Sequence, residues 1–133
     1  MQLVTINYLA GGRAAIESFA AEPNGGLVVD GNLFAIAPFE LVRLAEQYRL
    51  PAIYGTRLFT ANGGLMSYAG DLPEILHGVV TYVDRILRGV KVSELPVQNP
   101  TRFRLVVNLK AAKMIGLTIP SSFLLLRADE VIE

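Results

Sequence analysis

Five polar and aromatic residues follow short apolar runs, at positions where their side chains could bind a small molecule. They are Asp30, Asn32, Tyr54, Ser67 and Tyr68. The first two follow the apolar run 27–29, Tyr54 ends the run 51–54, and the last two end the run 65–68. Carboxylate, amide and hydroxyl groups make directional hydrogen bonds, and a tyrosine ring can stack on a flat or apolar ligand. The five residues therefore predict a ligand-facing rim.

Each of these residues also has a simpler structural explanation. Asp30 could cap the turn that follows its strand by accepting hydrogen bonds from backbone amides. Tyr54 and Tyr68 could be half-buried core residues. The sequence leaves both explanations open.

Other arrangements that could support chemistry are incomplete. His77 is the only histidine, and Glu74 three residues before it does not make a metal site. The pairs Gly11-Gly12, Gly25-Gly26 and Gly63-Gly64 lie outside any nucleotide-binding fingerprint, and no GxSxG elbow or cysteine offers a nucleophile. We therefore expect no catalytic residue, no metal and no cofactor.

Charge and hydropathy restrict the partners. Twelve basic residues balance twelve acidic ones, which disfavours nucleic acid and anionic membranes as partners. The basic group Arg102, Arg104, Lys110 and Lys113 is expected to form a solvated face. No apolar run reaches the ~20 residues of a membrane span, so no membrane insertion is expected. Hydrophobic residues make up 52% and charged residues only 18% of the chain, which favours a homo-oligomer.

The elements that would position the predicted rim alternate between strands and helices. Strands are predicted over residues 3–8, 27–29, 51–54, 65–68 and 103–107, and helices over 13–21, 38–48, 72–88, 109–114 and part of the tail from residue 121. A polar loop is predicted between residues 55 and 62. This alternation predicts an α/β fold, a parallel sheet with helices on both faces. In such sheets ligands bind outside the carboxyl ends of the strands, where the rim residues stand.

Several motifs resemble a known family. RLPAIYG, GGLMSYAGD and RADEVIE, in this order, resemble the C-terminal part of ABC-transporter substrate-binding proteins related to tryptophan and tyrosine uptake systems. Members of that family look like type I periplasmic binding proteins, in which two α/β lobes joined by hinge strands close on a solute. The resemblance implies that residues 1–62 form a second-lobe-like segment. It implies that residues 63–133 form a hinge-crossing strand and a return segment, packed as one compact unit or exchanged between copies.

The resemblance implies a function without catalysis. We expect a truncated substrate-binding component of an ABC importer that binds a small amino-acid-like or aromatic solute and works with an ABC permease. The rim residues match cleft-side positions of the family. Family members are extracytoplasmic, but no signal peptide precedes the first predicted strand, so the chain as given is expected in the cytoplasm.

An alternative is a stand-alone half-domain that oligomerises and has a structural role. The long helix 72–88 and the strand 103–107 would normally pack on the other lobe. Without it they are expected to expose an apolar stripe and a sheet edge, which a second copy could cover. A small doubly wound enzyme fits less well, because no acid–base pair or nucleotide loop is present.

Overall fold

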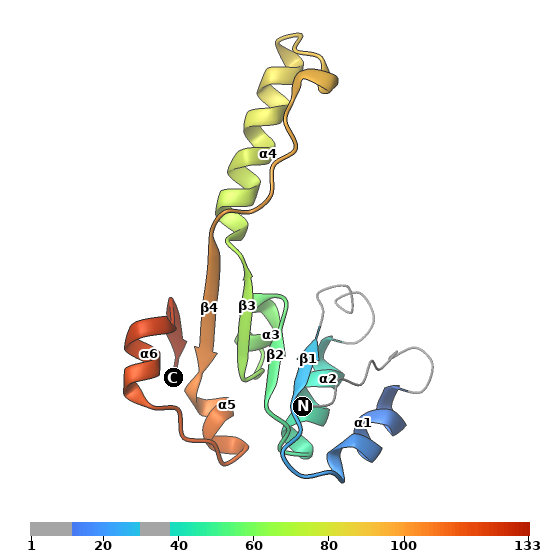
Figure 1. Ribbon diagram of the computed structural model, residues 1–133, viewed down its shortest axis with the longest axis vertical. Helices are drawn as coiled ribbons and strands as arrows, with labels where there is room; N and C mark the ends of the chain where they lie inside the picture. The colour runs from blue at the N-terminus through green and yellow to red at the C-terminus, as the bar shows by residue number, and fades with distance from the viewer. Residues whose placement is uncertain (1–11, 30–37) are drawn as a thin grey trace.

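The computed structural model describes residues 12–29 and 38–133 of the 133-residue chain. The strand predicted over residues 3–8 lies outside these ranges, as do Asp30 and Asn32. The described part contains one five-stranded sheet, in which the strands stand side by side in the order of the sequence (Figure 1). The strands are β1 (Leu27–Val29), β2 (Ala52–Tyr54), β3 (Met66–Gly70), β4 (Phe103–Asn108) and β5 (Glu130–Ile132).

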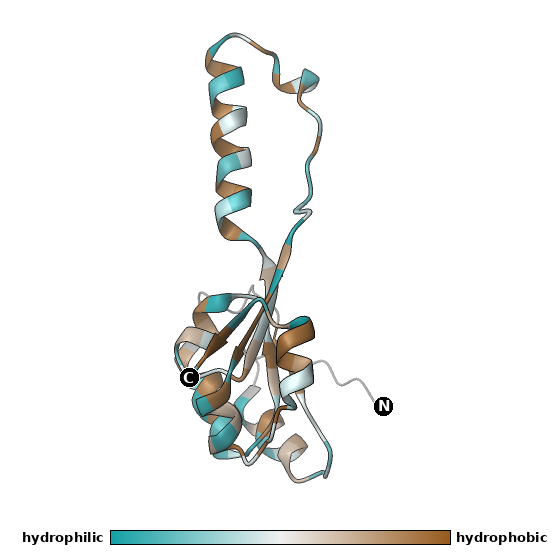
Figure 2. Cartoon of the chain, turned by 90° about the vertical axis from the view of Figure 1, so that its left-hand side faces the viewer, coloured by the Kyte–Doolittle hydropathy of each residue, from teal (hydrophilic) through white to brown (hydrophobic). Residues whose placement is uncertain are grey.

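Helices lie on both sides of this sheet (Figure 2), which confirms the predicted α/β class. They are α1 (Gly12–Ala20), α2 (Pro38–Gln47), α3 (Arg57–Ala61), α4 (Leu72–Leu87), α5 (Leu109–Met114) and α6 (Ser121–Arg127), with a 3₁₀ turn at Val92–Glu94. The short helix α3 replaces the predicted polar loop, and β5 was not predicted. Thr56 caps α3, since its side chain accepts a hydrogen bond from the Leu58 amide.

The sheet is mostly parallel, as expected, but two of its details differ from the expectation. Among the described residues β4 runs antiparallel to β3, while the other three strand pairs are parallel. The reason is that the chain leaves the sheet through β3 and returns through β4. The strand 103–107 is also no sheet edge, because β4 pairs with both β3 and β5.

The core lies between the sheet and the helices α2 and α3. Its largest fully buried side chains include Tyr54 and Phe59, whose rings stack with centroids 4.8 Å apart. Gly64 allows this packing, because a Cβ there would lie 2.7 Å from the Tyr54 ring and 2.9 Å from the Phe59 carbonyl oxygen. We call the sheet with α1, α2, α3, α5 and α6 the sheet lobe.

Residues 72–102, called the arm below, project away from the sheet lobe (Figure 1). The structure describes every residue of α4, and none of them is buried. Large apolar side chains that are 42–82% exposed run along this helix, and we call them the apolar stripe: Leu72, Leu76, Val79, Val80, Val83, Ile86 and Leu87. The predicted exposure of an apolar stripe on this helix is therefore confirmed.

The rest of the arm folds back along α4, on a flank that adjoins the apolar stripe, so that Val79 of the stripe faces the return segment. The Tyr82 hydroxyl donates a hydrogen bond to the Pro96 carbonyl, and the Thr101 hydroxyl donates one to Glu74 at 2.8 Å. Between these two attachments a groove of about 540 Å³ separates the helix from residues 98–101. The end of α4 is confirmed as predicted, because Gly89 adopts a positive φ of 93°.

The sheet continues across the predicted boundary between residues 62 and 63, since β3 pairs with β2. The division of the chain there, and an exchange of the second part between copies, stay predictions.

Candidate functional site

Of the three rim residues that the structure describes, the most exposed is Tyr68, at the base of the arm. Its ring is 54% exposed and stacks on the ring of Phe103, which is 46% exposed, with centroids 5.4 Å apart and planes 18° from parallel. Tyr68 stands opposite Leu105, and Phe103 stands opposite Gly70. Both rings therefore project from the same face of the sheet, because residues two apart in a strand share a face. We call this pair the aromatic platform.

Tyr54 projects from the other face. It pairs with Ser67 in the register of β2 and β3, and Ser67 is the neighbour of Tyr68 in the strand. The Tyr54 side chain is only 1% exposed and packs on Phe59. Burial raises the pKa of its hydroxyl, which therefore stays protonated near neutral pH.

Ser67 is as buried as Tyr54, at 1% exposure. Its hydroxyl has no hydrogen-bond partner among the residues that the structure describes. The structure thus separates the three described rim residues. Tyr68 is open to solvent, and Tyr54 and Ser67 lie within the sheet lobe on the opposite face.

Asp30 and Asn32 lie outside the described residues, so their role as ligands stays a prediction. The last described residue before them is the buried Val29, whose carbonyl accepts a hydrogen bond from the Gly55 amide at 3.0 Å. Val29 pairs with Tyr54 at the carboxyl end of β1. The segment that begins with Asp30 therefore starts at the carboxyl edge of the sheet.

Phe103 was not predicted as a site residue. Alternation within β4 alone does not reveal it, because the place of Phe103 on the face of Tyr68 depends on the antiparallel register of β4 with β3. Gly70 stands opposite Phe103, and Ile75 and Pro100 of the arm lie close to where a Gly70 Cβ would be.

Two ion pairs join elements of the structure, one where the arm meets the sheet lobe and one between α3 and β5. The buried carboxylate of Asp71 lies 3.6 Å from the Arg102 guanidinium, and the Asp71 amide donates to the Arg102 carbonyl at 2.9 Å. Arg57 donates two hydrogen bonds to Glu130, one of 2.9 Å, and thereby joins α3 to β5. These bonds hold the pKa of Glu130 below its ordinary value.

Most side chains of the predicted basic face are exposed to solvent. Arg102, Lys110 and Lys113 are exposed, while Arg104 is half-buried. The Nε of Arg104 is buried without a hydrogen-bond partner among the described residues.

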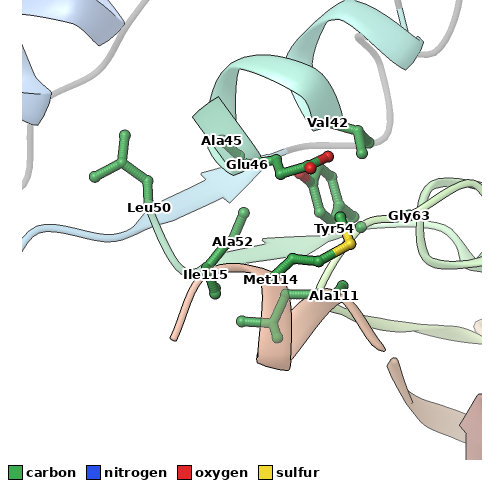
Figure 3. Close-up of a pocket in the computed structure, with 12 residues that line it drawn as sticks. Val42, Ala45, Glu46, Leu50, Ala52, Tyr54, Gly63, Ala111, Met114 and Ile115 are labelled. Atoms are coloured by element: carbon green, nitrogen blue, oxygen red, sulfur yellow. The ribbon is translucent and has the colours of Figure 1, made fainter. Parts of the chain in front are cut away.

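A small cavity between α2 and α5 offers no room for a solute (Figure 3). It is lined by apolar side chains that include Val42, Leu50 and Met114, together with one face of Tyr54. Its volume of about 10 Å³ is enough for at most one water molecule. The larger groove between α4 and residues 98–101 contains none of the described rim residues, whereas the aromatic platform contains Tyr68, so we take the platform as the candidate site.

Two further features bear on ligands and membranes. Within residues 12–29 and 38–133 no three acidic or histidine side chains lie together in a way that could hold a metal ion. In the same ranges no helix has both the length and the apolar character needed to cross a bilayer.

Solved structures share this fold. A conserved domain protein from Vibrio cholerae O1 biovar El Tor is 27% identical, with a TM-score of 0.77 over 90% of this chain and 40% of that one. An ABC domain from Streptococcus pneumoniae in complex with L-Trp is 23% identical, with a TM-score of 0.75 over 90% of this chain and 41% of that one. A ligand-free, open substrate-binding protein with adhesive properties from Clostridium difficile is 21% identical, with a TM-score of 0.62 over 98% of this chain and 42% of that one.

The chain thus spans about two-fifths of the length of these proteins. No curated protein matches it. The model of the family described as ABC transporter substrate binding protein matches residues 5–132, which is nearly the entire sequence. The chain therefore belongs to the ABC transporter substrate-binding protein family.

Proposed function

We propose that this chain forms one wall of the solute-binding cleft of an ABC importer's binding protein, and that the aromatic platform is the contact surface. The single observation that carries the proposal is the exposed stack of Tyr68 on Phe103 at the base of the arm. Two parallel rings left open to solvent offer a flat apolar surface on which a ligand can stack.

The chemistry of this surface favours a small aromatic or amino-acid-like solute. An aromatic ring would stack on the platform, and Asp30 and Asn32 would supply polar contacts from the carboxyl edge of β1. The L-Trp complex of the pneumococcal relative supports this class of solute. Tyr54 and Ser67 are buried on the opposite face of the sheet and would support the platform from behind.

The proposed role is binding without a chemical step. A permease would accept the solute outside the cytoplasm, and a separate ATPase would supply the energy of transport. Because the chain spans two-fifths of its structural relatives, a second wall of the cleft would come from another lobe.

L-Trp is a practical probe, because the chain contains five tyrosines and no tryptophan. Titrating the protein into L-Trp should produce a saturable change in the ligand's fluorescence. The variant Tyr68→Ala should weaken binding roughly threefold to tenfold, the value of one aromatic stack. Tyr68→Phe keeps the ring and should bind nearly as well as the unmodified protein.

Phe123→Ala is the matched control, because Phe123 is a partly exposed aromatic residue of α6 far along the chain from the platform. It should leave the affinity unchanged. A Tyr68→Ala protein that binds L-Trp as tightly as the Phe123→Ala protein would overturn the platform as the contact surface.

A second candidate function is favoured by the apolar stripe. A stand-alone half-domain that associates with itself would explain why a helix of 16 residues buries none of them in its own chain. In that case the chain would have a structural role, and L-Trp would not bind.

A further inference from the structure

The sequence Asn-Gly-Gly occurs twice in the chain, at residues 24–26 and 62–64. Both copies lie in connections of the sheet lobe, the first before β1 and the second before β3. An asparagine that precedes glycine loses its side-chain amide readily, because glycine has no side chain to hinder the attack of its backbone nitrogen on the asparagine Cγ. The two copies share this chemistry and differ in their surroundings.

We propose that Asn24 is a site of spontaneous deamidation in the folded protein, and that Asn62 is protected from the same reaction. The proposal does not depend on solute binding. The backbone nitrogen of Gly25 loses its proton and forms a bond with the Cγ of Asn24, while the bond from Cγ to Nδ2 breaks and ammonia leaves with that proton. Water then opens the succinimide ring at either carbonyl. The products are aspartate and isoaspartate, and water is the only co-reactant.

The turn at Asn24 favours this labile pair of residues. Asn24 has a positive φ of 63°, a conformation that asparagine adopts more readily than most residues. Gly25 lies against the ring of Phe19, because a Cβ at Gly25 would be 2.7 Å from the nearest ring atom. Phe19 in turn packs against the core of the sheet lobe. The fold therefore calls for an asparagine followed by a glycine at this turn.

The surroundings of Asn24 leave its side chain able to react. Asn24 is exposed, and its side chain makes no hydrogen bond with another residue of the ranges 12–29 and 38–133. The turn lies between the end of α1 at Ala20 and the start of β1 at Leu27, so neither a helix nor a strand holds its backbone. The amide can therefore rotate toward the nitrogen of Gly25, and water can reach the succinimide.

Asn62 is the C-cap residue of α3 and is held by its own chain. Its Nδ2 donates a hydrogen bond to the Leu58 carbonyl at 2.8 Å. The amide of Gly63, which would supply the attacking nitrogen, donates to the Thr60 carbonyl at 3.3 Å. Formation of the succinimide would break both bonds. We therefore expect Asn62 to react more slowly than Asn24 in the folded protein.

The last glycine of each copy differs in the same direction. Gly64 is buried, and its amide donates to the Phe59 carbonyl at 2.8 Å. Gly26 is exposed. The backbone that follows the attacking nitrogen is thus fixed in the second copy and more open to solvent in the first.

Isoaspartate at Asn24 would disturb the packing of α1. Its main chain passes through the former side-chain Cγ and is one carbon atom longer than that of aspartate. Gly25 would then shift against the ring of Phe19. The start of β1 is also close, because the Leu27 amide donates to the Pro51 carbonyl at 2.8 Å. Aspartate keeps the ordinary main chain, so we expect isoaspartate alone to weaken the attachment of α1 and β1.

Peptide mapping by mass spectrometry after incubation at mildly alkaline pH tests the proposal. In the folded chain Asn24 should convert at least roughly tenfold faster than Asn62, which corresponds to about 1.4 kcal/mol in activation free energy. In the chain unfolded by urea the two should convert at similar rates, because both precede two glycines.

Equal rates for the two asparagines in the folded chain would overturn the proposal. So would an Asn24 that stays intact in the folded chain over the time in which the unfolded chain converts. A tenfold difference that persists in urea would show that the fold does not cause it, and would likewise overturn the protection of Asn62.

Two variants test the structural consequence. Asn24→Gly removes the reacting amide and tolerates the positive φ, so its midpoint of urea unfolding should not change during incubation. Asn24→Asp gives the aspartate product alone and should unfold like the fresh, unmodified chain. The unmodified chain should lose stability as isoaspartate accumulates. An equal loss in the incubated Asn24→Gly chain would overturn the role of isoaspartate at this turn.

Discussion

Phe59 in α3 and Val83 in α4 are both large apolar side chains on helices, yet Phe59 is 1% exposed and Val83 is 50% exposed. The difference extends to the regions that contain them. The sheet lobe packs its helices against five strands, whereas within the described part of the chain α4 packs against an extended return segment alone. The sheet lobe can therefore be stabilised by its own core, and the arm depends on whatever covers its stripe.

The largest effect is expected when one buried and one exposed side chain are each replaced by alanine. Phe59→Ala should lower the free energy of unfolding by about 3–5 kcal/mol, because it leaves a cavity beside Tyr54. Val83→Ala should change the stability of the monomer by less than about 0.5 kcal/mol, because half of its side chain is already in water. Urea unfolding of both variants at low protein concentration measures the two effects. Equal losses would contradict the contrast.

A smaller effect is expected at the close approach of Gly64 to the core. Gly64→Ala places a methyl group 2.7 Å from the Tyr54 ring and 2.9 Å from a backbone oxygen. The clash should cost about 1–3 kcal/mol, the range for overpacked cores. Gly89→Ala is a useful comparison in the arm, since a Cβ there meets nothing within 4 Å and only the positive φ of 93° opposes it. If Gly64→Ala proves no more harmful than Gly89→Ala by urea unfolding, the packing described for the core is wrong.

The smallest effect concerns the ion pair between Arg57 and Glu130. Its hydrogen bonds lower the pKa of Glu130 in the folded state, so its contribution is present above the unfolded pKa of about 4.3 and is lost as pH falls through the folded pKa. Because Arg57 is 57% exposed, solvent screening keeps the contribution below about 1 kcal/mol.

Glu130→Gln should therefore destabilise the protein slightly at pH 7 and not at strongly acidic pH. Unfolding curves at both pH values measure the difference. A penalty that is the same at both would indicate a packing role rather than an ionic one.

Much of the fold could be predicted from the sequence, because long periodic segments determine their own structure. The 16-residue helix α4 and its termination at Gly89 followed from its stripe and from glycine's tolerance of a positive φ. The helix predicted over residues 109–114 is capped by Asn108, whose side chain accepts a hydrogen bond from the Ala111 amide at 2.9 Å. The five residues of α3 and the three of β5 are too short to show a period, and tertiary pairing decides their structure.

The candidate site was predicted less well. The sequence places Tyr54, Ser67 and Tyr68 at strand ends, but the side to which each points depends on strand register. Because Tyr54 pairs with Ser67, both lie on the face opposite Tyr68. Phe103 joins the platform only because β4 returns antiparallel beside β3, a pairing of residues 35 positions apart that local pattern does not encode.

Hydrogen exchange measured at several protein concentrations tests the central contrast most directly. Amide protection in the strands β2, β3 and β4 should be independent of protein concentration, because the sheet lobe contains its own core. Protection in α4 should be low in dilute solution, because none of its residues is buried. Protection of α4 that equals that of the sheet lobe in dilute solution would contradict this account.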